Sequence, residues 1–168
     1  GEDTLSLHDA LPIYVELILE DQSGLKIPKS AITKKDFYVI PEDYLTQGGN
    51  SNSTGVLIDT GKENAEFQAV DIYYRDTQTG SVYVDPDDFE KNTTLKKAGS
   101  SDTYQLSETK QLKGVYNINR GYAVFRQVDI LDQNEEYAIV SKNTAYGLAR
   151  YDHIVRNADK VDEEEILY

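Results

Sequence analysis

The sequence of 168 residues contains no cysteine and only two histidines. Without cysteine, the chain forms no disulfide bond, builds no cysteine-based metal site and offers no thiol nucleophile. No apolar run approaches the roughly 20 residues that a helix needs to span a bilayer. The lack of cysteine does not fix the compartment, because exported and cytosolic domains of this size can both do without it.

Acidic residues outnumber basic ones, and the chain carries a net charge of −13. A surface of this sign repels phosphate backbones, so the composition argues against nucleic acid as a partner. Hydrophobic residues make up 39% of the chain, which is sufficient for a core, and 13 tyrosines supply much of it. Tyrosine combines an apolar ring with a polar tip, which suits thin β-sandwiches and barrels.

Residues 4–13, Thr-Leu-Ser-Leu-His-Asp-Ala-Leu-Pro-Ile, are similar to the translation of a common adapter of short-read sequencing libraries. A match of this length in order is not expected by chance. We therefore interpret residues 1–13 as a non-native, adapter-derived segment and exclude it from fold reasoning. On this interpretation the native chain begins near Tyr14, its N-terminal region is missing, and residues 14–168 carry a net charge of −10.

Short β-type runs separated by polar turns predict an all-β architecture, a short-stranded barrel or sandwich. The expected strands are residues 14–20, 25–27, 36–40, 55–59, 67–75, 81–85, 114–118, 121–131, 136–141 and 152–156. Residues 76–80, Asp-Thr-Gln-Thr-Gly, are expected to close a hairpin. Residues 93–103 are interpreted as mostly turn. No sustained helical period is visible.

Two segments have a specific expected geometry. Pro28 is expected to end a strand, because proline cannot donate to a β-ladder, and Ile27 and Ile32 are expected to be buried on one side of a domain junction. Residues 48–54, Gly-Gly-Asn-Ser-Asn-Ser-Thr, are expected to form a polar loop tip that buries little and is the most mobile part of the native region.

Few residues qualify for chemistry. His8 belongs to the adapter-like segment, which leaves His153, and strand alternation puts its side chain opposite those of Asp152 and Ile154. We interpret it as a surface histidine rather than a general base. Residues 85–88, Asp-Pro-Asp-Asp, carry oxygen ligands for calcium but lack the glycine turn and distal glutamate of an EF-hand, so a helix cap is favoured.

The remaining motifs add no site. The sequons that begin at Asn52 and Asn92 are interpreted as turn residues. No nucleophile elbow, zinc-protease motif or phosphate loop occurs. The sequence therefore predicts no catalytic residue, no cofactor-binding residue and no metal ligand, and it predicts a protein that is not an enzyme.

Two blocks of sequence together resemble a known family. The first is residues 24–32, Gly-Leu-Lys-Ile-Pro-Lys-Ser-Ala-Ile, followed by residues 36–40. It resembles the hydrophobic-Pro-x-x-Ala-hydrophobic element that ends the β-barrel domain of periplasmic adaptor proteins, the hemolysin-D-like membrane fusion family. The second comprises residues 121–131, 136–140 and 147–155 and is similar to the family's ending, Gly-Leu-x-x-Gly-Asp-x-Val-Val. Tyr151 departs from it, standing where the family commonly has glycine.

The resemblance implies three parts: a non-native segment 1–13, the end of a β-barrel domain at 14–34, and a membrane-proximal-like β domain at 35–168 with an insertion at about 41–113. It also implies a non-enzymatic adaptor subunit of an efflux or secretion system, at the extracytoplasmic face of the bacterial cytoplasmic membrane. The implied partners are a membrane transporter, either permease or ATPase, and further copies in a ring. Membrane anchoring would come through the missing N-terminal part, and no cofactor is implied.

The sequence leaves a second class open, an extracellular β-sandwich module that binds carbohydrate or protein. Its supporting feature is the tyrosine content, since exposed tyrosines make good contacts for both ligands. Sequence upstream of Tyr14 would distinguish the two classes, because an adaptor requires a lipoyl-like half and a membrane anchor there.

Overall fold

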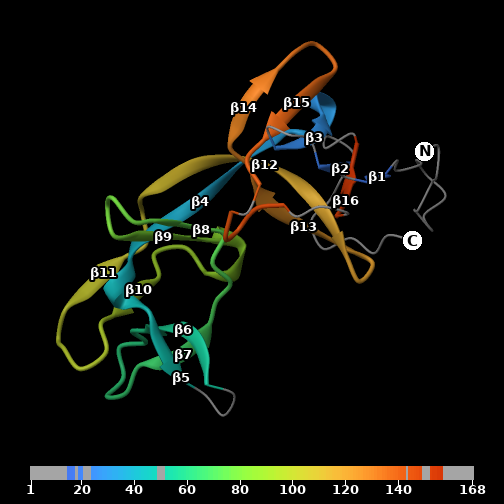
Figure 1. Cartoon of the computed structure of the whole chain (residues 1–168). Coiled ribbons are helices and arrows are strands. Elements are labelled where there is room, and N and C mark those ends of the chain that lie inside the picture. Colours follow the sequence, from blue (N-terminus) through green and yellow to red (C-terminus); the bar gives the residue numbers. More distant parts are fainter. Residues whose placement is uncertain are drawn as a thin grey trace. The chain divides into compact units, whose positions relative to one another are not determined.

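The computed structural model of the chain describes residues 15–17, 19–20, 24–48, 52–142, 144–148 and 152–156. In this part the chain is all-β: strands are joined by turns and by three one-turn 3-10 helices, and the curled sheets form half-barrels. The prediction of an all-β fold is confirmed. The chain divides into two compact units, and Figure 1 labels their strands. Unit 1 combines Gly1–Lys35 with Leu112–Tyr168, and unit 2 is Asp36–Gln111.

Unit 1 contains two antiparallel sets of strands. The first set comprises β1 (Val15–Leu17), β16 (His153–Val155), β12 (Thr109–Asn119) and β13 (Tyr122–Gln127), each paired with the next. The second comprises β14 (Ile130–Gln133), β15 (Tyr137–Val140), β3 (Leu25–Pro28) and β2 (Leu19–Glu20) in that order. The 3-10 helix η1 (Lys29–Ala31) follows β3. β12 begins in unit 2 and enters unit 1 at Leu112.

The core of unit 1 draws on both ends of the sequence. Its larger described cluster consists of Leu25, Ile27, Ala31, Val115, Val128, Ala138, Val140, Leu148 and Ile154, and Ala123 and Val155 form a smaller one. Pro28 ends β3, as predicted, and Ile27 is fully buried. Ile32 packs against the same core, although it is only half-buried. The prediction is confirmed for Pro28 and Ile27, whereas Ile32 is less buried than expected.

Unit 2 is built from shorter strands. It comprises most of β4 (Thr33–Pro41), η2 (Glu42–Tyr44), β5 (Thr46–Gly48), β6 (Ser53–Ile58), β7 (Glu66–Ala69), β8 (Tyr74–Asp76), β9 (Ser81–Val84), η3 (Pro86–Asp88), β10 (Thr94–Lys96) and β11 (Thr103–Gln105). In one set, β9 pairs with both β4 and β8. In the other set, the order is β11-β10-β6-β5, and β7 also pairs with β6. Its separate core consists of Ile40, Tyr44, Val56, Val82, Val84, Leu95 and Leu106.

The hairpin expected at residues 76–80 is confirmed. β8 pairs with β9 in antiparallel register, and the amide of Gly80 donates to the carbonyl of Asp76 at 2.9 Å. The carboxylate of Asp76 also accepts from the amides of Gln78 and Thr79. The aspartate thus satisfies the turn's backbone donors, which is why this short polar sequence reverses the chain.

Residues 93–103 were expected to be mostly turn, and residues 97–102 are turn, bend or irregular, but the prediction missed the strand β10. Residues 93–103 contain β10 and the first residue of β11. β10 pairs with β6 on one side and β11 on the other, and Leu95 is fully buried in the unit 2 core. A single buried leucine between polar neighbours leaves no alternating pattern, so only the tertiary pairing makes this segment a strand.

Two expected strands are interrupted. Residues 67–75 divide into β7 and β8, because the chain leaves β6 after Ala69 and joins β9 at Tyr74. Residues 121–131 divide into β13 and β14 at Val128 and Asp129. There the amide of Val128 donates to the carbonyl of Lys113 at 2.9 Å, and the carbonyl of Asp129 accepts from Ser141. Both breaks occur where a strand exchanges its partner.

The loop expected at residues 48–54 is shorter than predicted. Gly48 ends β5, and Ser53 and Thr54 begin β6, with Gly48 paired to Ser53. Residues 49–51 lie outside the described part. An added Cβ at Gly48 or Gly55 would meet the ring of Phe67, so the two glycines leave room for that ring beside the ladder. The expectation that this segment is the most mobile part remains a prediction.

Candidate functional site

His153 lies on β16 with an exposed side chain, and its strand neighbour Ile154 is fully buried. β16 pairs with β1, where Leu17 is opposite His153. The prediction of a surface histidine on a strand is confirmed. An exposed imidazole without a buried partner lacks the positioning that a general base needs.

Residues 85–88 form a helix cap, as predicted. Asp85 precedes η3, its Oδ1 accepts from the amide of Asp87 at 2.9 Å, and Pro86 occupies the first helical position. Asp85 is buried, with 6% of its surface exposed. The carboxylate is therefore used to satisfy a backbone donor at the start of the helix.

The other acidic residues of this motif face solvent. Asp87 and Asp88 line an open depression of about 460 Å³ together with Glu66 and Glu90. Within the described ranges, no group of three or more His, Asp or Glu residues is arranged to hold a metal ion. The depression can bind cations only diffusely.

The sequons begin in turns, as expected. Asn52 and Asn92 adopt left-handed backbone conformations, with φ values of 59° and 62°. Asparagine tolerates this region better than most residues do, because its short polar side chain bonds locally. Residues 1–13 and Tyr151 lie outside the described part of the chain.

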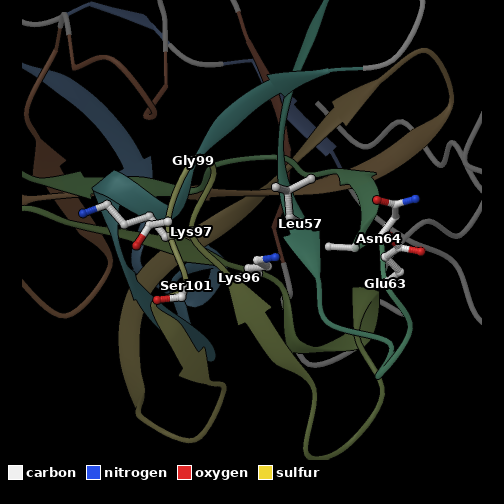
Figure 2. A pocket seen from close by; sticks show the side chains of 9 residues that line it. Leu57, Glu63, Asn64, Lys96, Lys97, Gly99 and Ser101 are labelled. Atoms are coloured by element: carbon white, nitrogen blue, oxygen red, sulfur yellow. The ribbon is translucent and has the colours of Figure 1, made fainter.

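One hollow in unit 2 is a polar depression of about 600 Å³ (Figure 2). Lys96 and Lys97 lie on one side of it, and Glu63 and Asn64 on the other. The two lysines are consecutive, and Figure 2 shows their side chains directed away from each other. Their ammonium groups therefore do not converge on one point. The lining can hydrogen-bond a polar ligand, but it contains no nucleophile paired with a base.

Lys97 is held by an ion pair at this depression. Its Nζ lies 3.0 Å from Oδ2 of Asp43, and this hydrogen-bonded carboxylate raises the pKa of Lys97. Both side chains contact solvent, so the pair contributes little to stability. Arg75 and Glu42 form a similar exposed pair at 2.7 Å. Both pairs use an acidic side chain of η2, Glu42 or Asp43.

Most of the described tyrosines are used in packing. Tyr44 and Tyr104 stack with ring centroids 5.8 Å apart, and Tyr74 meets Tyr83 edge to face at 5.4 Å. Among the tyrosines that the structure describes, only Tyr122 is exposed. The tyrosine content therefore serves the core more than the surface.

Residues 24–32 and the second block of the family resemblance meet in unit 1, whereas residues 36–40 belong to unit 2. The hydroxyl of Ser30, from the first block, donates to the carbonyl of Arg156 at 2.6 Å, directly after the second block. Gly147 packs so closely on Thr144 and on the carbonyl of Gln127 that an added Cβ would clash. Arg126 lies half-buried on β13, whose described pairing is with β12. The face around β13 is thus a firmly packed surface.

Comparison with known proteins gives no match to a family model, to a curated protein or to a solved structure. In the part of the chain that the structure describes, no helix is long and apolar enough to cross a membrane. Support for a function therefore comes from the residues of the chain and the way they pack.

Proposed function

We propose that this chain is part of a non-enzymatic adaptor subunit of an efflux or secretion system in a bacterial cell envelope. Its role would be to link a membrane transporter to an exit route on the extracytoplasmic side of the cytoplasmic membrane. The proposal rests on the two sequence blocks that resemble the hemolysin-D-like adaptor family and on the way these blocks pack.

One observation carries the proposal. Eight of the nine residues in the larger described core cluster of unit 1 come from the two blocks, the exception being Val115. Leu25, Ile27 and Ala31 belong to the first block, whereas Leu148 and Ile154 belong to the end of the second. More than a hundred residues separate these segments in the sequence. Residues 24–32 and the second block thus share one core, as is expected when distant motifs specify a single body, whereas residues 36–40 lie in unit 2.

The intervening sequence is consistent with an insertion. Unit 2 spans Asp36–Gln111 and has its own core, close to the bounds of about 41–113 that the resemblance leaves unexplained. The assignment of residues 14–34 and 35–168 to two domains of the family stays a prediction.

The mechanism we propose is interfacial. Unit 1 would dock on the outer surface of a transporter through the strands around residues 121–131 and 147–155. β13 supports this role, because it is described as paired with β12 and carries Arg126 as a half-buried polar side chain. A strand edge can add a strand of a partner by main-chain hydrogen bonds.

Crosslinking tests the proposal. A photoreactive residue would replace Arg126 in the protein expressed from its natural gene with its genomic neighbours, and Lys62, exposed in unit 2, would carry the same residue as the control. We expect crosslinks from position 126, but not from position 62, to an integral membrane transporter.

The alternative is an extracellular module that binds carbohydrate or protein. It requires exposed aromatic side chains, and among the described tyrosines only Tyr122 provides one. Tight binding of a glycan that is lost in Tyr122→Ala, with no crosslink to a membrane protein, would favour this alternative and overturn the adaptor proposal.

A further inference from the structure

Unit 1 contains a pocket of about 290 Å³ whose lining includes three lysines, Lys29, Lys34 and Lys113. They come from three elements: η1, the first residues of β4, and β12. The three lysines form no recognisable motif in the sequence, so no local pattern indicates the pocket. All its lining residues lie within unit 1.

The backbone around the pocket is fixed by specific contacts. The amide of Lys29 donates to the carbonyl of Glu136 at 2.8 Å, which ties η1 to the segment before β15. The carbonyl of Lys113 accepts from Val128 at 2.9 Å. The register of β14 against β15 shifts between Ile130 and Asp132. The extra residue of this bulge changes the strand alternation, so Ile130 and Gln133 both line the pocket.

The lining has a positive charge that the described residues do not neutralise. It contains no aspartate or glutamate. Within the described part of the chain, no carboxylate forms an ion pair with Lys29, Lys34 or Lys113. This is notable in a chain with a net charge of −13. Like charges gathered at one place repel, and a bound anion relieves the repulsion.

The pocket also has an apolar part. Ile32 and Ile130 line it, are half-buried, and pack against the unit 1 core. The three lysines are exposed and keep their charged ends in contact with solvent, whereas the half-buried isoleucines add apolar surface to the lining. Thr33 and Gln133 add neutral hydrogen-bonding groups. A lining that combines cations with apolar surface matches a ligand that carries an anionic head on an aliphatic body.

We propose that this pocket binds a phosphate ester with an aliphatic part. The lysine ammonium groups would hold the phosphate as point charges, which is how lysine commonly contacts phosphate. The isoleucines would contact the first methylene groups of the ester. The pocket shares Ile130 with the strands proposed for docking but is lined by no residue of β13, and its proposed ligand goes beyond the adaptor role.

The first experiment uses n-hexyl phosphate and isothermal titration calorimetry on the full chain at low salt. We expect hexyl phosphate to bind about tenfold more tightly than inorganic phosphate and hexanol not to bind, because only the ester uses both parts of the pocket. The affinity should fall as salt is added, since the lysine charges are solvent-accessible. Equal affinity for inorganic phosphate and hexyl phosphate would overturn the proposal.

The second experiment uses matched variants. The triple variant Lys29→Gln/Lys34→Gln/Lys113→Gln should weaken binding of hexyl phosphate about tenfold or more, and each single variant should weaken it about threefold. The control Lys62→Gln/Lys91→Gln/Lys110→Gln removes the same charge from exposed lysines outside the pocket and should change affinity less than twofold. Equal losses in both triple variants would show a non-specific charge effect and overturn the proposal. The single variants keep the test valid if the triple variant does not fold.

A third experiment distinguishes two sources of the same chemistry. Sedimentation with phosphatidylcholine vesicles that contain phosphatidic acid reports binding of a lipid head group. Binding to these vesicles that is lost in the lysine triple variant would assign the ester to a bilayer lipid, whereas binding of hexyl phosphate without vesicle binding would assign it to a free ester. Binding to neither would overturn the proposal. None of these tests involves a transporter, so their outcome does not depend on whether the adaptor function is correct.

Discussion

Tyr83 and Tyr104 are residues whose ionisation is linked to folding. Burial raises the pKa of both phenols, and the carboxylate of Glu108 adds to the effect, together with Asp76 in the case of Tyr83. The hydroxyl of Tyr104 also donates to the carbonyl of Val39 at 3.0 Å. Each of these features favours the neutral phenol in the folded chain.

The consequence for stability follows from the sign of the shift. A tyrosine with a raised pKa in the folded state stabilises the fold below its ordinary pKa of 10.0, and this stability is lost as the pH rises through the folded pKa. We expect the free energy of unfolding, measured with urea, to fall above pH 10. Ultraviolet titration should show tyrosinate forming later than in the unfolded chain, and the late component should decrease in Tyr83→Phe. If neither Tyr83→Phe nor Tyr104→Phe reduced the tyrosinate signal that forms at the highest pH, the raised pKa would not belong to these two residues.

Gly114 is a residue whose missing side chain makes room for a ring. It lies buried on β12, and an added Cβ would meet the ring of Phe125 and the carbonyl of Arg126 on the neighbouring strand. Phe125 is itself 1% exposed and has no free space to move into. We expect Gly114→Ala to lower the free energy of unfolding by about 1–3 kcal/mol, as overpacking does. Thr109→Ala, at an exposed position of the same strand, should change it by less than about 0.5 kcal/mol.

At the level of the element, the hairpin of β12 and β13 is closed by a two-residue turn, Arg120-Gly121. Both residues have positive φ, 53° and 85°, which is the type I′ geometry that suits the twist of paired strands. Arginine is strained there because of its Cβ, whereas asparagine tolerates the left-handed region. We expect Arg120→Asn to stabilise the chain by about 0.5–1 kcal/mol in urea unfolding.

The matching control for this turn is a residue that cannot adopt the conformation. Arg120→Val introduces a β-branched side chain at positive φ and should destabilise the chain. If both variants had the same stability, the turn would not have the geometry described. The sequence identified residues 119–120 as a break between strands, but the turn type became clear only from the paired register.

At the level of the whole molecule, residues 1–13 are interpreted as foreign to the native chain. They lie outside the described residues, and the interpretation rests on their similarity to an adapter translation. We expect deletion of residues 1–13 to change the midpoint of thermal unfolding, measured by circular dichroism, by less than about 1 °C. A loss of 1 kcal/mol would shift the midpoint by about 2–8 °C in a protein of this size, so a shift of several degrees would show that the segment contributes to the fold.

The sequence by itself determined the all-β class, the hairpin at residues 76–80, the cap at Asp85 and the strand end at Pro28. Each depends on local chemistry: alternation, an aspartate that satisfies nearby amides, or a proline that lacks a donor. The surface position of His153 followed for the same reason, since neighbouring residues of a strand point to opposite faces.

The tertiary structure decided what depends on distant partners. β10 is a strand because β6 and β11 lie beside it, and Leu95 fills a core that its own neighbours do not reveal. The eight core residues of the two family-like blocks, and the three lysines of the pocket, come together only when segments from both ends of the sequence pack in unit 1. Local sequence patterns indicate which secondary structure a segment favours. Burial and the clustering of charges depend on which segments become neighbours in the fold.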